Sequence, residues 1–185
     1  MRLSLKHMFG PFAGAVLCVL MVHHAVSLTV EKISLEELTV QSDLIVRGMV
    51  VSASSQWEQS NIYTYTTIRV EESLKGNPPT DLKVKQLGGR VGEITANVPG
   101  TPELNPKDEV ILFLREWNGD YWIHSIVLGK FTVLREGSTP MTVSDLNNVG
   151  LVDPVTKQEI TDHAGKINTI PLESFLNEVR SLSRH

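Results

Sequence analysis

The sequence has 185 residues, with 17 Lys and Arg against 21 Asp and Glu, which gives a net charge of −4. An acidic balance of this kind disfavours general binding to nucleic acids or to anionic membranes. The single cysteine, Cys18, excludes an internal disulfide framework.

The N-terminal 27 residues have the pattern of a targeting segment. Arg2 and Lys6 precede an apolar run over 8–22, and the small residues Ala25 and Ser27 follow it at the positions next to a cleavage site. The pattern predicts a signal peptide (1–27) cleaved after Ser27 and export to the periplasm or the extracellular medium. An uncleaved anchor is the alternative, but the run is shorter than the roughly 20 residues that span a bilayer.

Cleavage would leave residues 28–185, a length typical of one domain. The remaining 15 Lys and Arg against 21 Asp and Glu would give a net charge of −6. Cys18 would also be removed, so the exported chain is expected to hold no disulfide and to depend on its hydrophobic core. No other apolar stretch of the sequence is long enough to span a membrane.

The first half of the predicted domain is expected to form a short helix and two strands. Ser34 and Glu37 stand at capping-box spacing, which predicts a helix start. The aliphatic stretch 43–52 predicts a buried strand, with Gly48 as a bulge. Strict alternation of β-formers over 62–74 predicts a long strand with two different faces.

The second half adds shorter strands and a final helix. Gly88 to Gly92 is expected to be a flexible turn, 136–169 mostly loop with room for a short edge hairpin, and 171–183 a helix with one apolar stripe. The further strands are expected over 82–87, 109–114, 121–126 and 129–134, with a hairpin turn at 118–120.

About six short strands with a helix near each end predict a mainly β protein built as a small barrel or sandwich. The expected organisation is a barrel domain over 28–135 and a loop-rich extension over 136–185, whose helix packs on the barrel.

Three segments carry a resemblance to known proteins: 42–50 (SDLIVRGMV), 65–76 (YTTIRVEESLKG) and 107–114 (KDEVILFL). In this order they resemble a family of exported bacterial proteins, and they are similar to netrin-like domains, the group that includes tissue inhibitors of metalloproteinases. The resemblance covers roughly 34–134. It implies an OB-fold-like barrel of about five or six strands with a short N-terminal helix and a C-terminal amphipathic helix.

The resemblance implies a fold and no activity, because function resides in sites and not in folds. Netrin-like inhibitors are held by disulfides and act through an N-terminal cysteine that reaches the zinc of the target. The exported chain would contain no cysteine, so this inhibitory mode does not carry over.

No catalytic, cofactor-binding or metal-binding motif is found in the sequence. His124 lies in an expected strand, without acidic or histidine neighbours at ligand spacing. The run from Gly88 to Gly92 lacks the Gly-Lys-Ser/Thr ending of a phosphate loop. The sequence therefore predicts no catalytic residue, no metal and no cofactor.

Aromatic residues supply the candidate binding surface. Tyr63 and Tyr65 alternate on one face of the long strand, and Trp117 and Trp122 lie near the expected hairpin. We include Arg90, at the centre of the glycine-rich turn, as a contact for an anionic group. These rings either bind a protein or glycan partner or pack against the barrel.

The leading functional hypothesis is a non-enzymatic exported binding module for a protein partner in the periplasm or outside the cell. One alternative is a cysteine-independent protease inhibitor that inserts the loop from Val98 to Pro102 or the new N-terminus. Another is a hydrolase with an unrecognised site. Convergent ionisable side chains in one pocket would favour the enzyme, and a flat aromatic surface would favour the module. The sequence does not set the oligomeric state.

Overall fold

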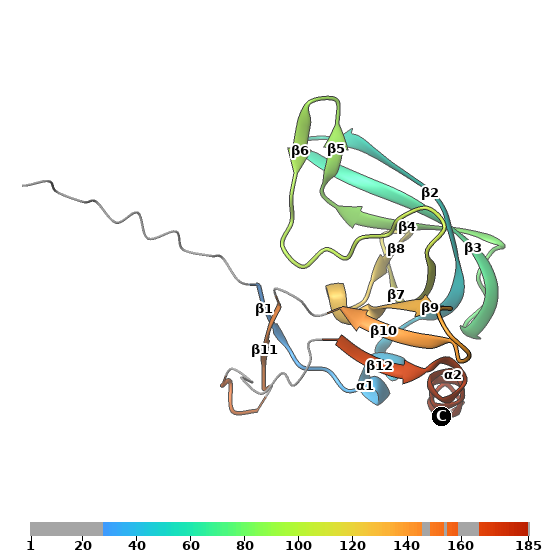
Figure 1. Cartoon of the computed structure of the whole chain (residues 1–185). Helices are drawn as coiled ribbons and strands as arrows, with labels where there is room; N and C mark the ends of the chain where they lie inside the picture. Colours follow the sequence, from blue (N-terminus) through green and yellow to red (C-terminus); the bar gives the residue numbers. More distant parts are fainter. Residues whose placement is uncertain (1–27, 146–148, 154, 159–166, 185) are drawn as a thin grey trace, which may run out of the picture.

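The computed structural model describes residues 28–145, 149–153, 155–158 and 167–184 (Figure 1). The predicted signal peptide lies outside the described residues. Strands account for 51% of the structure and helices for 16%, so the prediction of a mainly β protein is confirmed.

The elements follow one another with short connections. In chain order they are β1 (Leu28–Glu31), α1 (Leu35–Gln41), β2 (Leu44–Glu58), β3 (Asn61–Lys75), β4 (Asp81–Leu87), β5 (Gly89–Val91), β6 (Ile94–Ala96), β7 (Glu109–Trp117), β8 (Asp120–Ile123), the 3₁₀ helix η1 (Ile126–Gly129), β9 (Lys130–Leu134), β10 (Met141–Asp145), β11 (Val149–Val152), β12 (Ile167–Pro171) and α2 (Leu172–Leu182).

Five strands close into a barrel in the order β7-β2-β3-β4-β8, with β8 returning to β7. Every neighbouring pair is antiparallel except β4 and β8, which run parallel and complete the ring. This is the five-stranded, partly open barrel of the OB type. The expected OB-fold-like barrel, with a short helix near its start and a helix at its C-terminal end, is therefore confirmed.

The core has two parts because β2 and β7 are buried on both faces. Val46 and Leu112 point into the barrel, whereas Ile45 and Phe113 point outward and pack against the helices. Phe175 of α2 is fully buried on this outer side. Figure 1 shows α1 and α2 together at the end of the molecule opposite the β5–β6 hairpin.

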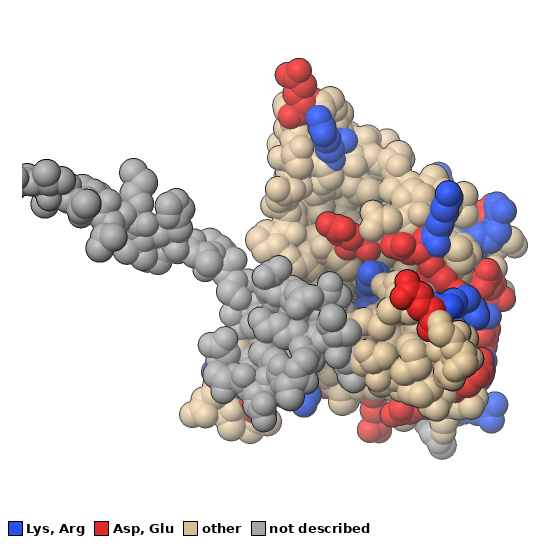
Figure 2. Space-filling view, in the orientation of Figure 1, with Lys and Arg blue, Asp and Glu red and all other residues tan. Residues whose placement is uncertain are grey.

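A charge network links α2 to the barrel and to the end of β9. Glu72 accepts from Arg180 at 2.6 Å and from Arg47 at 3.3 Å, and Arg47 also donates to Glu109 at 2.9 Å. Arg135 donates to Glu109 at 2.6 Å. Burial of Glu109 opposes its ionisation, but the two guanidinium groups overcome this and lower its pKa. Figure 2 shows basic and acidic side chains interspersed on this side of the molecule.

The region after β9 departs from the sequence prediction. The segment expected to be mostly loop contributes β10, β11 and most of β12, and β10 pairs with both β9 and β12. β10 and β12 are antiparallel, but β11 lies between them in the chain, so this pair is not the short edge hairpin for which the sequence left room. The parallel pairing of β1 with β11 was not predicted. Polar residues, including the buried Thr142 and Ser144 of β10, gave this segment little of the apolar alternation that predicts a strand.

Two boundaries in the barrel also differ. The strand expected over 121–126 ends at Ile123, because η1 begins at Ile126. The turn expected from Gly88 to Gly92 contains β5 and leads into the hairpin with β6. Gly88 and Gly89 have φ of 97° and 131°, a backbone region that side-chain-bearing residues rarely adopt, so both glycines are required by the hairpin's entry.

Gly48 lies at a register shift between β2 and β3, as the sequence predicts. A Cβ atom at this position would lie 2.3 Å from the carbonyl oxygen of Arg69. We expect Gly48→Val to lower the free energy of unfolding by about 1–3 kcal/mol or more, because the two strands would have to separate. Urea denaturation measures this change. Val51→Thr, at a position of the same strand that is 45% exposed, is the control and is expected to stay within about 0.5 kcal/mol.

Candidate functional site

Four aromatic rings gather on the outside of the barrel, and we call this set the aromatic face: Tyr63, Tyr65, Trp117 and Trp122. The ring centroids of Tyr63 and Trp122 lie 6.1 Å apart, and those of Trp117 and Trp122 lie 6.0 Å apart, both edge to face. Cross-strand register produces the cluster, because β4 brings Lys85 opposite Tyr65 on one side and Trp122 on the other. Trp117 is 64% exposed, whereas the other three rings are half-buried.

Lys85 lies at the centre of the aromatic face. Its ammonium group is 4.6 Å from the ring centroid of Tyr63, 5.2 Å from that of Tyr65 and 5.6 Å from that of Trp122. It donates to Glu58 at 2.8 Å and to Asp120 at 2.9 Å. The side chain is only 11% exposed, so rings and carboxylates together enclose a desolvated cation.

The ionisable groups around Lys85 stabilise one another's charge states. The hydrogen bond from Lys85, aided by one from the Tyr65 hydroxyl, lowers the pKa of Glu58 to about 2. The same bond to Glu58 raises the pKa of Lys85. Burial, followed by the bond to Glu58, raises the pKa of Tyr65. Each of these pKa values moves away from neutral pH.

This arrangement combines the two features that separate the enzyme hypothesis from the module hypothesis. Four ionisable side chains converge, as a hydrolase would need, and they do so on an aromatic surface. General acid–base catalysis is most efficient when the pKa of the group lies near the working pH. The pKa values of Glu58, Tyr65 and Lys85 are shifted away from neutral pH, so these groups keep fixed charge states and are suited to lasting electrostatic contacts.

An apolar depression of about 210 Å³ adjoins the aromatic face. Its walls include Leu87, Val98, Pro102, Trp122, Ile123 and Ile126. Ile126 is 40% exposed and has a φ of 54°, which is an uncommon conformation for a β-branched residue. Strained residues of this kind persist only where the surrounding structure holds them, and they are frequent at binding sites.

Arg90 does not join the other four predicted surface residues. Its backbone amide donates to Ser55, and Ser55 pairs with Thr64. Thr64 alternates with Tyr63 and Tyr65 along β3, so Arg90 and the tyrosines lie on opposite sides of that strand. The Arg90 side chain instead donates to the Gly92 carbonyl within its own hairpin, at 3.0 Å.

His124 occupies a buried structural position. Its Nδ1 atom lies 3.3 Å from the hydroxyl of Ser42, which itself donates to the carbonyl of Leu38 at the end of α1. Both side chains are under 10% exposed, and burial lowers the pKa of His124. The Ser–His pair therefore joins α1 to the barrel and presents no accessible nucleophile.

The segment from Val98 to Pro102, expected as an inserting loop of an inhibitor, runs across the mouth of the barrel. Pro102 is buried, and its carbonyl accepts from Gln86 at 2.9 Å. The sequence prediction missed Lys85, Glu58 and Asp120. The only available signal was that Lys85 alternates outward on the strand expected next to Tyr65.

Among the described residues, no group of His, Cys, Asp and Glu side chains is arranged to hold a metal ion. The same part of the chain contains no helix that is long and apolar enough to cross a bilayer. Comparisons with protein-family models, with curated proteins and with solved structures gave no match.

Proposed function

We propose that this chain is an exported, non-enzymatic binding module that takes a protein partner on its aromatic face. The observation that carries the proposal is the row of edge-to-face rings around Lys85, ending at the exposed indole of Trp117. Trp and Tyr are enriched among the residues that dominate protein–protein binding, because they bury large rigid surfaces and lose little side-chain entropy.

The apolar depression supports a protein as the partner. Anchoring side chains of an interface are typically buried in pockets next to aromatic residues. The depression has room for one aliphatic or aromatic side chain, and Leu87 and Ile126 leave apolar surface exposed at its edge. Glu58 and Asp120 are both ion-paired with Lys85, so a partner would not have to desolvate an unpaired carboxylate here.

Export is part of the proposal and rests on the N-terminal targeting pattern. The relationship to netrin-like domains is a further part of it, supported by the OB-type strand order of the barrel. OB-type barrels use the outer face of their second and third strands for ligands, and in this chain those strands are β3 and β4.

Affinity capture with matched tryptophan variants tests the proposal. The tagged protein is incubated with envelope extract and culture fluid of the native organism, and bound proteins are identified by mass spectrometry. We expect Trp117→Ala to lose the partner that the unchanged protein retains. Trp57→Ala is the control, because Trp57 is 47% exposed but pairs with Ile62 on the opposite face of the same strands.

A partner retained equally by both variants would place the binding surface elsewhere and contradict the assignment to the aromatic face. Absence of any enriched protein would count against a protein partner. A partner lost from Trp117→Ala alone would support the proposal, and its measured affinity would then be compared between the two variants.

A further inference from the structure

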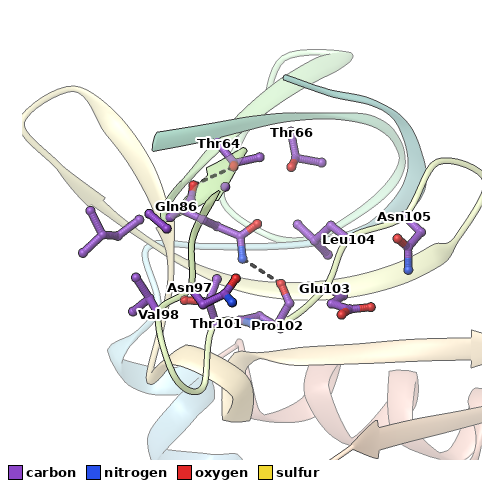
Figure 3. A pocket seen from close by; sticks show the side chains of 14 residues that line it. Thr64, Thr66, Gln86, Asn97, Val98, Thr101, Pro102, Glu103, Leu104 and Asn105 are labelled. Atoms are coloured by element: carbon purple, nitrogen blue, oxygen red, sulfur yellow. Dashed lines mark hydrogen bonds between the residues drawn. The ribbon is translucent and has the colours of Figure 1, made fainter. Parts of the chain in front are cut away.

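A second cavity lies at the mouth of the barrel, separate in character from the aromatic face. It has a volume of about 300 Å³, between the inner sides of β3 and β4 and the loop that follows β6. Figure 3 shows side chains from both strands and from the loop directed toward the same space. Its polar lining residues are Thr64, Thr66, Gln86, Asn97, Thr101 and Glu103.

Thr66 supplies an unpartnered hydroxyl at this cavity. Its side chain is fully buried, and its Oγ1 atom has no hydrogen-bond partner. Within the described residues only one other buried side-chain polar atom, the indole nitrogen of Trp122, shares this condition. Burial of an unsatisfied hydroxyl costs free energy, whereas an aliphatic residue such as the neighbouring inward Ile68 would cost none.

The groups around Thr66 are held in place by their own bonds. Gln86 is 8% exposed, and its amide nitrogen donates to the Pro102 carbonyl, which holds the loop across the cavity (Figure 3). Thr64 donates to the Gly88 carbonyl at 2.7 Å. A Cβ atom on Gly89 would clash with the Thr64 hydroxyl, so only glycine allows the backbone of β5 to pass this close to Thr64.

The lining selects against anionic ligands. No Lys or Arg lines the cavity, and its only ionisable residue is Glu103, so an anion would meet a carboxylate and no cation. Figure 2 shows largely uncharged surface over the base of the β5–β6 hairpin. The remaining walls include the apolar side chains of Leu87, Val98 and Leu104.

Hydroxyl and amide groups beside aliphatic surface match a ring whose edge carries hydroxyls and whose faces carry C–H groups. A volume of about 300 Å³ is at the lower end of small-molecule sites, which suits one or two such rings. From this chemistry we infer that the barrel-mouth cavity binds a neutral saccharide unit. This site goes beyond the proposed protein-binding function. None of the four rings of the aromatic face lines it, and it shares part of its wall with the apolar depression: Gln86, Leu87, Val98, Thr101 and Pro102.

Titration of the ¹⁵N-labelled full-length chain, followed by NMR, tests the inference. The probes are glucose, N-acetylglucosamine, maltose and cellobiose, with glucuronate and inorganic phosphate as anionic controls. We expect at least one neutral saccharide to shift the backbone amides of Gly88 and Gly89 and the side-chain amide of Gln86. Neither anion is expected to shift them, because the cavity offers no cation. Shifts from glucuronate or phosphate alone, or from none of the probes, would overturn the inference.

Thr66→Val tests whether the Thr66 hydroxyl binds a ligand or stabilises the fold. Because the hydroxyl has no internal partner, the variant is expected to melt at the temperature of the unchanged protein or higher, while its affinity for the saccharide falls at least tenfold. Thr67→Val is the matched control, since Thr67 points to the outer face of the same strand, and it should keep the affinity. Asn97→Ala, on the loop side of the cavity, provides a second variant and should also weaken binding. Unchanged saccharide affinity in both cavity variants would refute the site.

Discussion

Replacing Phe113 with alanine is expected to lower the free energy of unfolding by about 3–5 kcal/mol. Phe113 is fully buried on the outer side of β7, with its ring centroid 5.7 Å from that of Phe131 and 6.3 Å from that of Phe175. The truncation removes the ring that β9 and α2 share, and the closed barrel strands on either side of β7 limit how far the site can collapse. Urea denaturation followed by circular dichroism measures the loss.

Leu134→Ala is the control for this prediction, because Leu134 is 42% exposed at the end of β9 and should cost little. The expected transition of Phe113→Ala is a single one, since α2 and the barrel bury the same residues. A loss below about 1 kcal/mol, or separate melting of the helix with an intact barrel, would contradict a shared core and would make the segment after β9 an independent extension.

Barrel strands that are strongly patterned were predictable from the sequence. The continuous apolar run over 109–114 predicted a strand, and β7 occupies that place. Val110 to Leu114 are all buried, and their side chains alternate between the barrel interior and the helices. The alternation along β3 correctly separated inward Ile68 from outward Tyr63 and Tyr65. Both signals arise from burial, which acts on each residue locally.

Short strands and strands with distant partners were not predictable in the same way. The β5–β6 hairpin is local, but each of its strands has only three residues, too few to show an alternating pattern. β10 and β12 are polar and are separated in the chain by β11, so their pairing depends on the tertiary fold. A single sequence does not show which strand each of them will pair with. Their polar and turn-forming residues therefore predict loop.

The candidate site shows the same limit at the level of side chains. Lys83 and Lys85 look equivalent in the sequence, since both alternate outward on β4. In the structure Lys83 is exposed, but Lys85 is opposite Tyr65 and Trp122 and lies between two carboxylates. The difference comes from cross-strand register and from strand β8 closing the barrel, neither of which follows from alternation alone.

Lys85→Met is expected to raise the pKa of Glu58 from about 2 toward its ordinary value of 4.5. The substitution removes the group whose hydrogen bond is the largest cause of the lowering, and it leaves the carboxylates of Glu58 and Asp120 without the cation that they share. An NMR titration of the Glu58 carboxyl carbon measures the change. Lys83→Met is the matched control and should leave the pKa of Glu58 near 2, because Lys83 contributes to none of the shifts around this cluster.

The pH dependence of stability gives an independent measure of the same effect. In the unchanged protein the pKa of Glu58 is depressed on folding, so its contribution to stability is fully present above pH 4.5 and is lost as the pH falls toward 2. In Lys85→Met this loss should become smaller, because the pKa of Glu58 in the folded state moves toward its value in the unfolded state. A Glu58 pKa that stays near 2 without Lys85 would mean that backbone or tyrosine contacts set it, and Lys85 would then not be the group that holds the aromatic face in its charge state. A raised pKa would establish Lys85 as the cation that keeps Glu58 ionised beside the rings.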